Sequence, residues 1–177
     1  MRRSSMATAG VGAAVAVLGM GVPATGAPRP AAKDYGGVEV RQAGGSTEPL
    51  IATFKQAKCR RTNGGFVAEA KSTPGSHPMT LYAEIQSEGW KGFSHAYPLL
   101  RRAQRPADPV VFIRAPGNTE YDSTVAVPGA PGGGAIAFAP KGKAISIGGV
   151  FFLRDDTEVG VAVSGAMSCT YKTKKKK

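Results

Sequence analysis

Residues 158–171 read Glu-Val-Gly-Val-Ala-Val-Ser-Gly-Ala-Met-Ser-Cys-Thr-Tyr, with apolar side chains at every second position over most of the stretch. A period of two directs one side-chain set toward a core and the other toward solvent. We therefore expect a half-buried β-strand here. Its inward face carries Val159, Val161, Val163, Met167, Cys169 and Tyr171.

The N-terminal segment has the composition of a signal peptide. Two arginines precede an uncharged run over residues 9–22 that is too short to cross a bilayer comfortably. Small residues follow and suit cleavage after Ala24 or Ala27. No cysteine lies near this point, which argues against a lipid anchor there. We predict that residues 1–27 are removed on export; the alternative is that they stay as an N-terminal anchor.

The composition behind this segment indicates one basic, turn-rich domain. The chain has a formal net charge of +11, and it contains 24 glycines and 13 prolines in 177 residues. Frequent turn residues favour short strands over long helices. We expect a Pro/Ala/Gly-rich linker over residues 28–36, one domain over residues 37–171 and a basic tail over residues 172–177.

The chain has two cysteines, Cys59 in an early β-like run and Cys169 in the terminal one. Cysteines of exported proteins are usually paired, because their compartment is oxidising. We predict a Cys59–Cys169 disulfide that ties the end of the domain to its beginning. The alternative, a reactive thiol, would need a histidine and an acidic partner, and the sequence shows no such motif near either cysteine.

Apolar runs with β character recur through the domain. They cover residues 37–41, 50–59, 66–71, 79–86, 110–114, 121–127, 135–139 and 145–153. Seven to nine strands at this spacing, without a long amphipathic helix, predict a single antiparallel β-sandwich. One run is internally inconsistent, because Phe54 and Cys59 have opposite parity and can share the core only across a β-bulge.

Residues 88–106 interrupt this pattern. Pro98 could begin a short helix near residues 98–104. The segment gathers aromatic and basic side chains, which together suit a sugar ring or an anionic polymer. These candidate binding residues are Trp90, Lys91, Phe93, His95, Tyr97, Arg101, Arg102 and Arg105. The alternative is that the aromatic side chains cap one end of the core.

The C-terminal tail concentrates positive charge. It contains Lys174, Lys175, Lys176 and Lys177, which would be attracted to an anionic cell-wall polymer, an acidic glycan or lipid headgroups. The alternative is a solubilising tail without a dedicated partner. Nucleic acid would satisfy the same charges, but export argues against it.

No pattern in the sequence indicates a catalytic, cofactor or metal site. The histidines are His77 and His95, without the spacing of a zinc site, and Ser94 beside His95 would point the opposite way in a strand. Asp156 and its acidic neighbours are typical of a turn, although they could hold calcium.

The layout resembles small exported all-β proteins of actinobacteria, with a signal peptide, paired cysteines and a final valine-rich strand. Residues 161–169 are similar to the last strand of mycobacterial lipoprotein antigens of the LpqH type, whose lipid-bearing cysteine is absent here. This resemblance implies a compartment and a fold and assigns no functional residue.

We therefore expect a secreted or envelope-associated, non-enzymatic protein that binds anionic surface material. The alternative is a secreted hydrolase with dispersed catalytic residues, which would need a deep pocket lined by a histidine or paired carboxylates.

Overall fold

The computed structural model describes residues 35–43, 48–100, 108–125, 133–154 and 156–171. The predicted signal peptide, most of the linker and the basic tail lie outside these residues. The described chain is all-β, as predicted, with eleven strands and two short 3-10 turns. The strands are β1 (Gly37–Gln42), β2 (Leu50–Phe54), β3 (Gln56–Arg61), β4 (Phe66–Lys71), β5 (Thr80–Ile85), β6 (Tyr97–Leu99), β7 (Val110–Arg114), β8 (Glu120–Asp122), β9 (Gly134–Phe138), β10 (Ala144–Leu153) and β11 (Gly160–Tyr171); the turns are η1 (Pro116–Asn118) and η2 (Pro140–Gly142).

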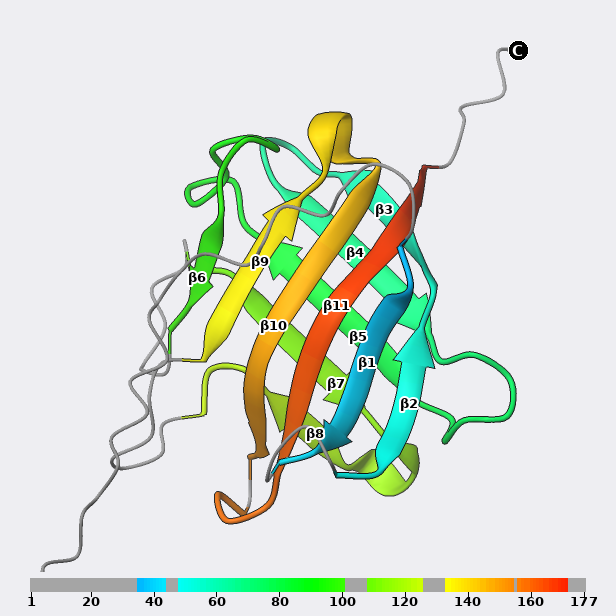
Figure 1. Ribbon diagram of the computed structural model, residues 1–177. Coiled ribbons are helices and arrows are strands. Elements are labelled where there is room, and N and C mark those ends of the chain that lie inside the picture. The colour runs from blue at the N-terminus through cyan, green and yellow to red at the C-terminus, as the bar shows by residue number, and fades with distance from the viewer. Residues whose placement is uncertain (1–34, 44–47, 101–107, 126–132, 155, 172–177) are drawn as a thin grey trace, which may run out of the picture.

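The strands form two layers that are joined at two corners (Figure 1). The front layer contains β6, β9, β10, β11, β1 and β2, and the back layer contains β3, β4, β5, β7 and β8. At one corner the end of β11 pairs with β3, and at the other the end of β10 pairs with β8. Since β10 and β11 also pair with each other, seven strands (β3, β4, β5, β7, β8, β10 and β11) form a closed ring.

This arrangement corrects two parts of the predicted fold. The strand count of seven to nine is too low, and the sheet is mixed because β11 runs parallel to β3. The cause lies in the two longest strands, which have ten and twelve residues and reach from one layer into the other. Glycines interrupt both strands, at Gly148 and Gly149 in β10 and at Gly165 in β11, and glycine permits bending of this kind.

The run over residues 50–59, expected as one strand, is two strands that belong to different layers. It breaks at Lys55, after which the chain leaves the edge of the front layer and enters the back layer. Phe54 and Cys59 are both buried, because each faces the core from its own strand. The change of layer therefore lets both side chains face the core, which was expected to require a β-bulge.

The helix expected near residues 98–104 is absent from the part of that range that the structure describes. Residues 97–99 form β6, which pairs with β9, while residues 101–107 lie outside the described chain. Pro98 has no backbone N–H to donate, and this is tolerated because β6 is an edge strand. The strand expected over residues 121–127 is also shorter, since β8 ends at Asp122.

Both edges of the sheet are protected against further strand pairing. On β2, the carbonyl oxygens of Ile51 and Thr53 accept hydrogen bonds from the backbone N–H groups of His77 and Thr73, in the loop between β4 and β5. On the opposite edge, Pro98 interrupts the row of donors of β6. Such devices prevent edge-to-edge aggregation.

The core lies between the two layers, and β11 contributes to it largely as predicted. Val161, Val163 and Met167 are buried in the core, and Cys169 packs against it. Val159 and Tyr171 were expected on the same face, but both are 40% exposed because they lie at or beyond the ends of the strand.

Candidate functional site: a basic end beside the C-terminus

Five aromatic side chains close one end of the core. This is the upper end in Figure 1, where β9 and β11 finish and β4 begins. Trp90 stacks between Phe66 and Tyr97, with ring centroids 5.6 Å away on each side, and Phe93 meets its edge at 5.1 Å. Phe138 completes the cluster from β9. Both faces of the Trp90 ring are therefore occupied by protein, as in the capping arrangement weighed from the sequence.

The loop that carries Trp90 is fixed by the hydroxyl of Tyr97. This hydroxyl donates to the carbonyl oxygen of Gly92 at 2.7 Å and accepts from the backbone N–H of Lys91 at 2.9 Å. Burial raises the pKa of Tyr97, and the N–H of Lys91 opposes that change. The phenol therefore stays neutral at physiological pH, and Lys91 is held at the exposed side of the cluster.

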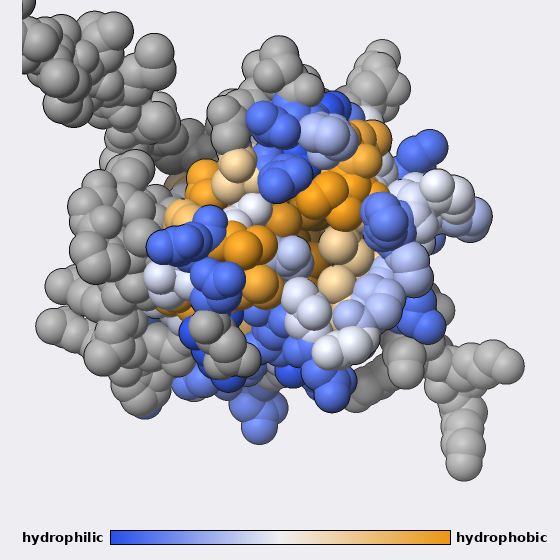
Figure 2. Space-filling view, turned by 90° about the horizontal axis from the view of Figure 1, so that it is seen from below, coloured by the Kyte–Doolittle hydropathy of each residue, from blue (hydrophilic) through white to orange (hydrophobic). Residues whose placement is uncertain are grey.

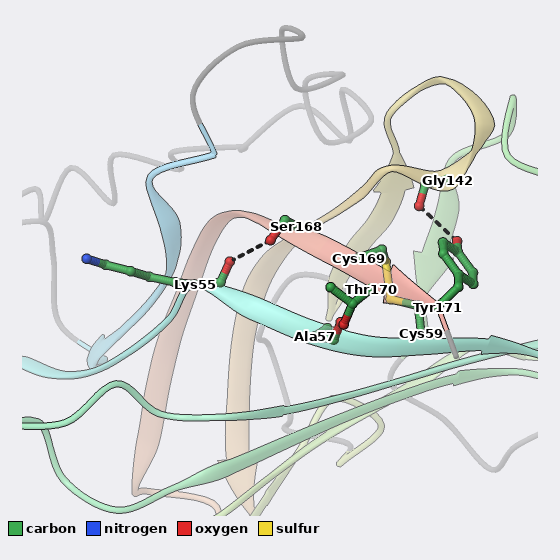
Figure 3. Close-up of a disulfide and its surroundings, with 8 residues drawn as sticks. All are labelled: Lys55, Ala57, Cys59, Gly142, Ser168, Cys169, Thr170 and Tyr171. Atoms are coloured by element: carbon green, nitrogen blue, oxygen red, sulfur yellow. Dashed lines mark hydrogen bonds between the residues drawn. A yellow bond between two sulfur atoms is a disulfide. The ribbon is translucent and has the colours of Figure 1, made fainter. Parts of the chain in front are cut away.

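The last residues of β11 are bound firmly to the early part of the domain (Figure 3). The predicted disulfide between Cys59 and Cys169 is present. The Thr170 hydroxyl donates to the carbonyl oxygen of Ala57 at 2.9 Å, and the Tyr171 hydroxyl donates to that of Gly142 at 2.8 Å. The chain is thus anchored on both sides at the point from which residues 172–177 continue.

Tyr171, at the end of β11, meets three other segments of the chain, which carry Arg61, Phe93 and Gly142. The guanidinium of Arg61 lies 4.7 Å from the ring centroid of Phe93, which places a cation on an aromatic face. A side chain at Gly142 would overlap both the Phe93 ring and the Tyr171 hydroxyl, so this position has room only for glycine. Burial raises the pKa of Tyr171, and the nearby positive charge of Arg61 only partly opposes this rise. Because the phenol remains neutral, it does not offset the positive charge of Arg61.

Basic side chains surround this meeting point. We call this surface the basic end; it consists of Lys58, Arg60, Arg61, Lys91, Lys141 and Lys143, all exposed. Within the described chain, only Arg60 among them has an ion-pair partner, Glu69, at 4.0 Å. The other five are exposed and have no carboxylate of the described residues in ion-pair range.

The arginines toward the opposite, lower end are neutralised by close partners. Arg41 pairs with Glu39 at 2.9 Å, and Arg114 pairs with Glu120 at 2.6 Å. Arg154 contacts Asp122 at 2.8 Å. The ion pairs of the described residues are therefore concentrated away from the basic end.

The lower end instead exposes apolar surface. Figure 2 looks at this end and shows hydrophobic side chains gathered in the middle with hydrophilic ones around them. Leu50 is 47% exposed there and lines a hollow of about 420 Å³ together with His77. A second hollow of about 430 Å³ lies between Asn118 and Arg154. Each of the two is open to solvent.

The structure brings together only part of the predicted site. Trp90, Phe93 and Tyr97 serve packing, whereas Lys91 and His95 are exposed on the same loop. The other seven predicted residues lie outside the described chain: Arg101, Arg102, Arg105, Lys174, Lys175, Lys176 and Lys177. His77 and His95 are on different loops, one after β4 and one before β6.

Sequence reasoning missed five residues of the basic end. Arg60 and Arg61 precede a hairpin turn, while Lys141 lies in a 3-10 turn and Lys143 follows it, so each pair resembles ordinary turn chemistry. Lys58 is one of several outward-facing residues of β3. Their proximity to the C-terminus depends on the pairing of β3 with β11, which local sequence patterns do not encode.

Two further observations concern ligands and membranes. No three His, Cys, Asp or Glu side chains of the described residues are grouped as a metal site requires. In the same residues, no helix has the length and apolar character needed to cross a membrane.

The chain matches no protein-family model, no curated protein and no solved structure. Any functional proposal therefore depends on the chain's own residues.

Proposed function

We propose that the protein is exported and binds anionic polymers of the cell envelope through the basic end and the lysine tail, without catalysing a reaction. One observation supports this above all others. Five cations that have no ion-pair partner among the described residues surround the point at which the described chain ends and the basic tail begins, while the lower arginines are neutralised.

The chemistry of these side chains favours a polyanion as the ligand. Arginine offers a planar fork to carboxylate or phosphate, and lysine adds a flexible point charge. Several such contacts along one polymer would act together, because they lie on one end of one rigid domain. Cell-wall polymers, acidic glycans and lipid headgroups all present the required charge.

The aromatic cluster limits the kind of ligand that can be recognised, because its rings are largely covered by one another. Since Phe66 and Tyr97 cover both faces of Trp90, a sugar ring has no place to stack on it. Recognition would then depend on charge, and exposed charges are screened by salt within about 10 Å at 0.1 M ionic strength. Binding should therefore weaken steeply as salt is added.

The disulfide supports an oxidising compartment outside the cytosol. A Cys59–Cys169 bridge persists in oxidising surroundings and is rare in the cytosol. Together with the signal-peptide pattern of residues 1–27, it favours a secreted or envelope-associated protein.

The proposal is tested by binding of the purified protein to envelope fractions of its own source at low and high salt. Removal of residues 172–177 should weaken binding, and K141Q/K143Q should lower affinity about two- to fivefold per charge at low salt, the range of an exposed ion pair. K71Q is the matched control, because Lys71 is equally exposed but lies at the far end of β4.

Two outcomes would contradict the proposal. One is the absence of binding at low salt. The other is an equal loss per charge in K71Q and K141Q/K143Q, because this would assign the effect to net charge and not to the basic end.

A further inference from the structure

Tyr171 presents an aromatic ring to solvent within the basic end. It is 40% exposed, and no other aromatic side chain of the described residues is as exposed. Trp90, by contrast, is covered on both faces by Phe66 and Tyr97. None of the ring contacts among the described residues involves Tyr171. The basic end therefore has an accessible aromatic ring, although Trp90 does not supply it.

The position of this ring is fixed from two sides (Figure 3). The Tyr171 hydroxyl donates to the carbonyl oxygen of Gly142, which is buried, at 2.8 Å. On the backbone side, Thr170 is hydrogen-bonded to Ala57 and Cys169 is held by the disulfide. An exposed side chain that is already ordered loses little conformational entropy when it contacts a ligand. The ring is therefore preorganised for binding.

Three cations lie beside the ring on other segments of the chain. Lys141 and Lys143 are the sequence neighbours of Gly142, whose carbonyl oxygen binds the Tyr171 hydroxyl. Arg61 ends β3, which pairs with β11, and its charge acts on the same hydroxyl. All three cations are exposed and have no carboxylate of the described residues in ion-pair range. An aromatic face and unpaired positive charges are thus available to one ligand.

This combination matches a sugar ring that carries an acidic group. The C–H groups on one face of a sugar ring can pack against the apolar face of a tyrosine, while a carboxylate or phosphate on the sugar binds arginine or lysine. A polyanion without sugar rings would use the cations alone and leave the aromatic face exposed.

A lipid surface matches the same residues less well. Membrane binding strengthens with the apolar area that is inserted, so it needs several apolar anchors side by side. The other large exposed apolar side chains of the described residues are Leu50 and Val159, which lie toward the lower end (Figure 1). A single ring among cations therefore favours a sugar polymer over a bilayer.

We infer that Tyr171 is a stacking surface for sugar rings and that the ligand of the basic end is accordingly an acidic polysaccharide. This inference rests on the proposed binding of polyanions by the basic end and names the class of polyanion. One sugar ring lies against Tyr171, and acidic groups of the same or a neighbouring sugar bind Arg61, Lys141 and Lys143. The contact with the ring is not ionic, so it persists when salt screens the charges.

Two polycarboxylates of matched charge test the inference: polygalacturonate, whose units are acidic sugars, and polyglutamate, which has no sugar rings. The purified protein should prefer polygalacturonate, and the preference should remain when salt is raised. Y171L should lower the affinity for polygalacturonate about two- to tenfold, the range of an aromatic contact, and leave that for polyglutamate unchanged. Unchanged binding of polyglutamate also shows that Y171L is folded.

Two further variants separate the ring from the charges. Y171F keeps the ring and loses the hydrogen bond to Gly142, so it should retain most of the preference for polygalacturonate. K141Q/K143Q removes charge and keeps the ring, so it should weaken the binding of both polymers to a similar degree.

Different outcomes would overturn the inference and the proposed function. Binding of neither polymer at low salt would contradict the proposed function itself. Binding of both without a preference, or with an equal loss for both in Y171L, would overturn only the role of Tyr171. A larger effect of Y171L on binding to vesicles of phosphatidylglycerol and phosphatidylcholine than on binding to polygalacturonate would assign the ring to a lipid surface.

Discussion

Gly149 lies where β10 passes close to the chain that enters β9. A side chain at this position would overlap the carbonyl oxygen of Gly133 and contact the ring of Phe151. The adjacent Gly148 has open space at the corresponding point. A side chain therefore fits at Gly148 but not at Gly149, although the two glycines are neighbours in one strand.

We predict that G149A lowers the free energy of unfolding by about 2–4 kcal/mol, because backbone atoms must move to relieve the overlap. G148A should change it by no more than about 0.5 kcal/mol. Urea denaturation of both variants measures the difference. Similar values for the two would show that the approach of Gly133 to β10 is not a tight constraint.

For single residues, the sequence predicts whether a side chain faces the core better than it predicts which groups that side chain contacts. The alternation of Val161, Val163 and Met167 is enough to identify their buried face. The roles of Gly142 and Gly149 could not be predicted, because the groups they approach come from other strands and loops. Lys141 and Lys143 were missed for the same reason.

The pairing of β11 with β3 is short, and the disulfide lies within it. Four residues of each strand are in register, and the Cys59–Cys169 bridge links the same two strands. A cross-link over 110 positions removes much conformational freedom from the unfolded chain. The bridge should therefore contribute strongly to stability.

We predict that C59A/C169A loses about 2–5 kcal/mol of unfolding free energy relative to the oxidised protein. Urea unfolding with and without dithiothreitol measures this loss. The reductant should lower the stability of the unmodified protein to a similar degree and leave the double variant unchanged. A reductant effect on the double variant would mean that the loss has another origin.

Most of the strands could be predicted from the sequence, and some of their ends could be predicted as well. The run over residues 110–114 is β7, and that over residues 66–71 is β4. The failures occurred where partners decide the structure: the break at Lys55 depends on which layer each half joins, and β6 forms because β9 offers it an edge.

At the scale of the molecule, the closed ring makes the two layers mechanically dependent on each other. β10 and β11 contribute to both layers, so neither layer can separate without breaking strand pairs at a corner. The aromatic cluster around Trp90 spans both layers at the upper end, since Phe66 comes from β4 and Phe138 from β9.

We predict a single cooperative unfolding transition, because no part of the ring can open alone. Trp90 is the sole tryptophan, so its fluorescence reports on the upper end, while far-ultraviolet circular dichroism reports on all strands. The two denaturation curves should coincide. A fluorescence change at lower denaturant concentration would instead show that the upper end unfolds independently.

The sequence could not predict the ring, because closure requires a parallel contact between β3 and β11 that lies outside any repeating pattern. The all-β class follows from composition and periodicity, whereas the number of strands was underestimated. Which strands meet at the corners depends on the length and curvature of β10 and β11, and these are properties of the assembled sheet.

The parallel contact between β3 and β11 also sets the order of events when the chain is made. β3 is among the first strands to leave the ribosome or a translocation channel, and β11 is the last strand of the described domain. The early strand must therefore wait, with one side unpaired, until residue 171 has emerged. This domain consequently cannot complete its fold until β11 is available, and any factor that holds the nascent chain open has the whole length of the domain in which to act.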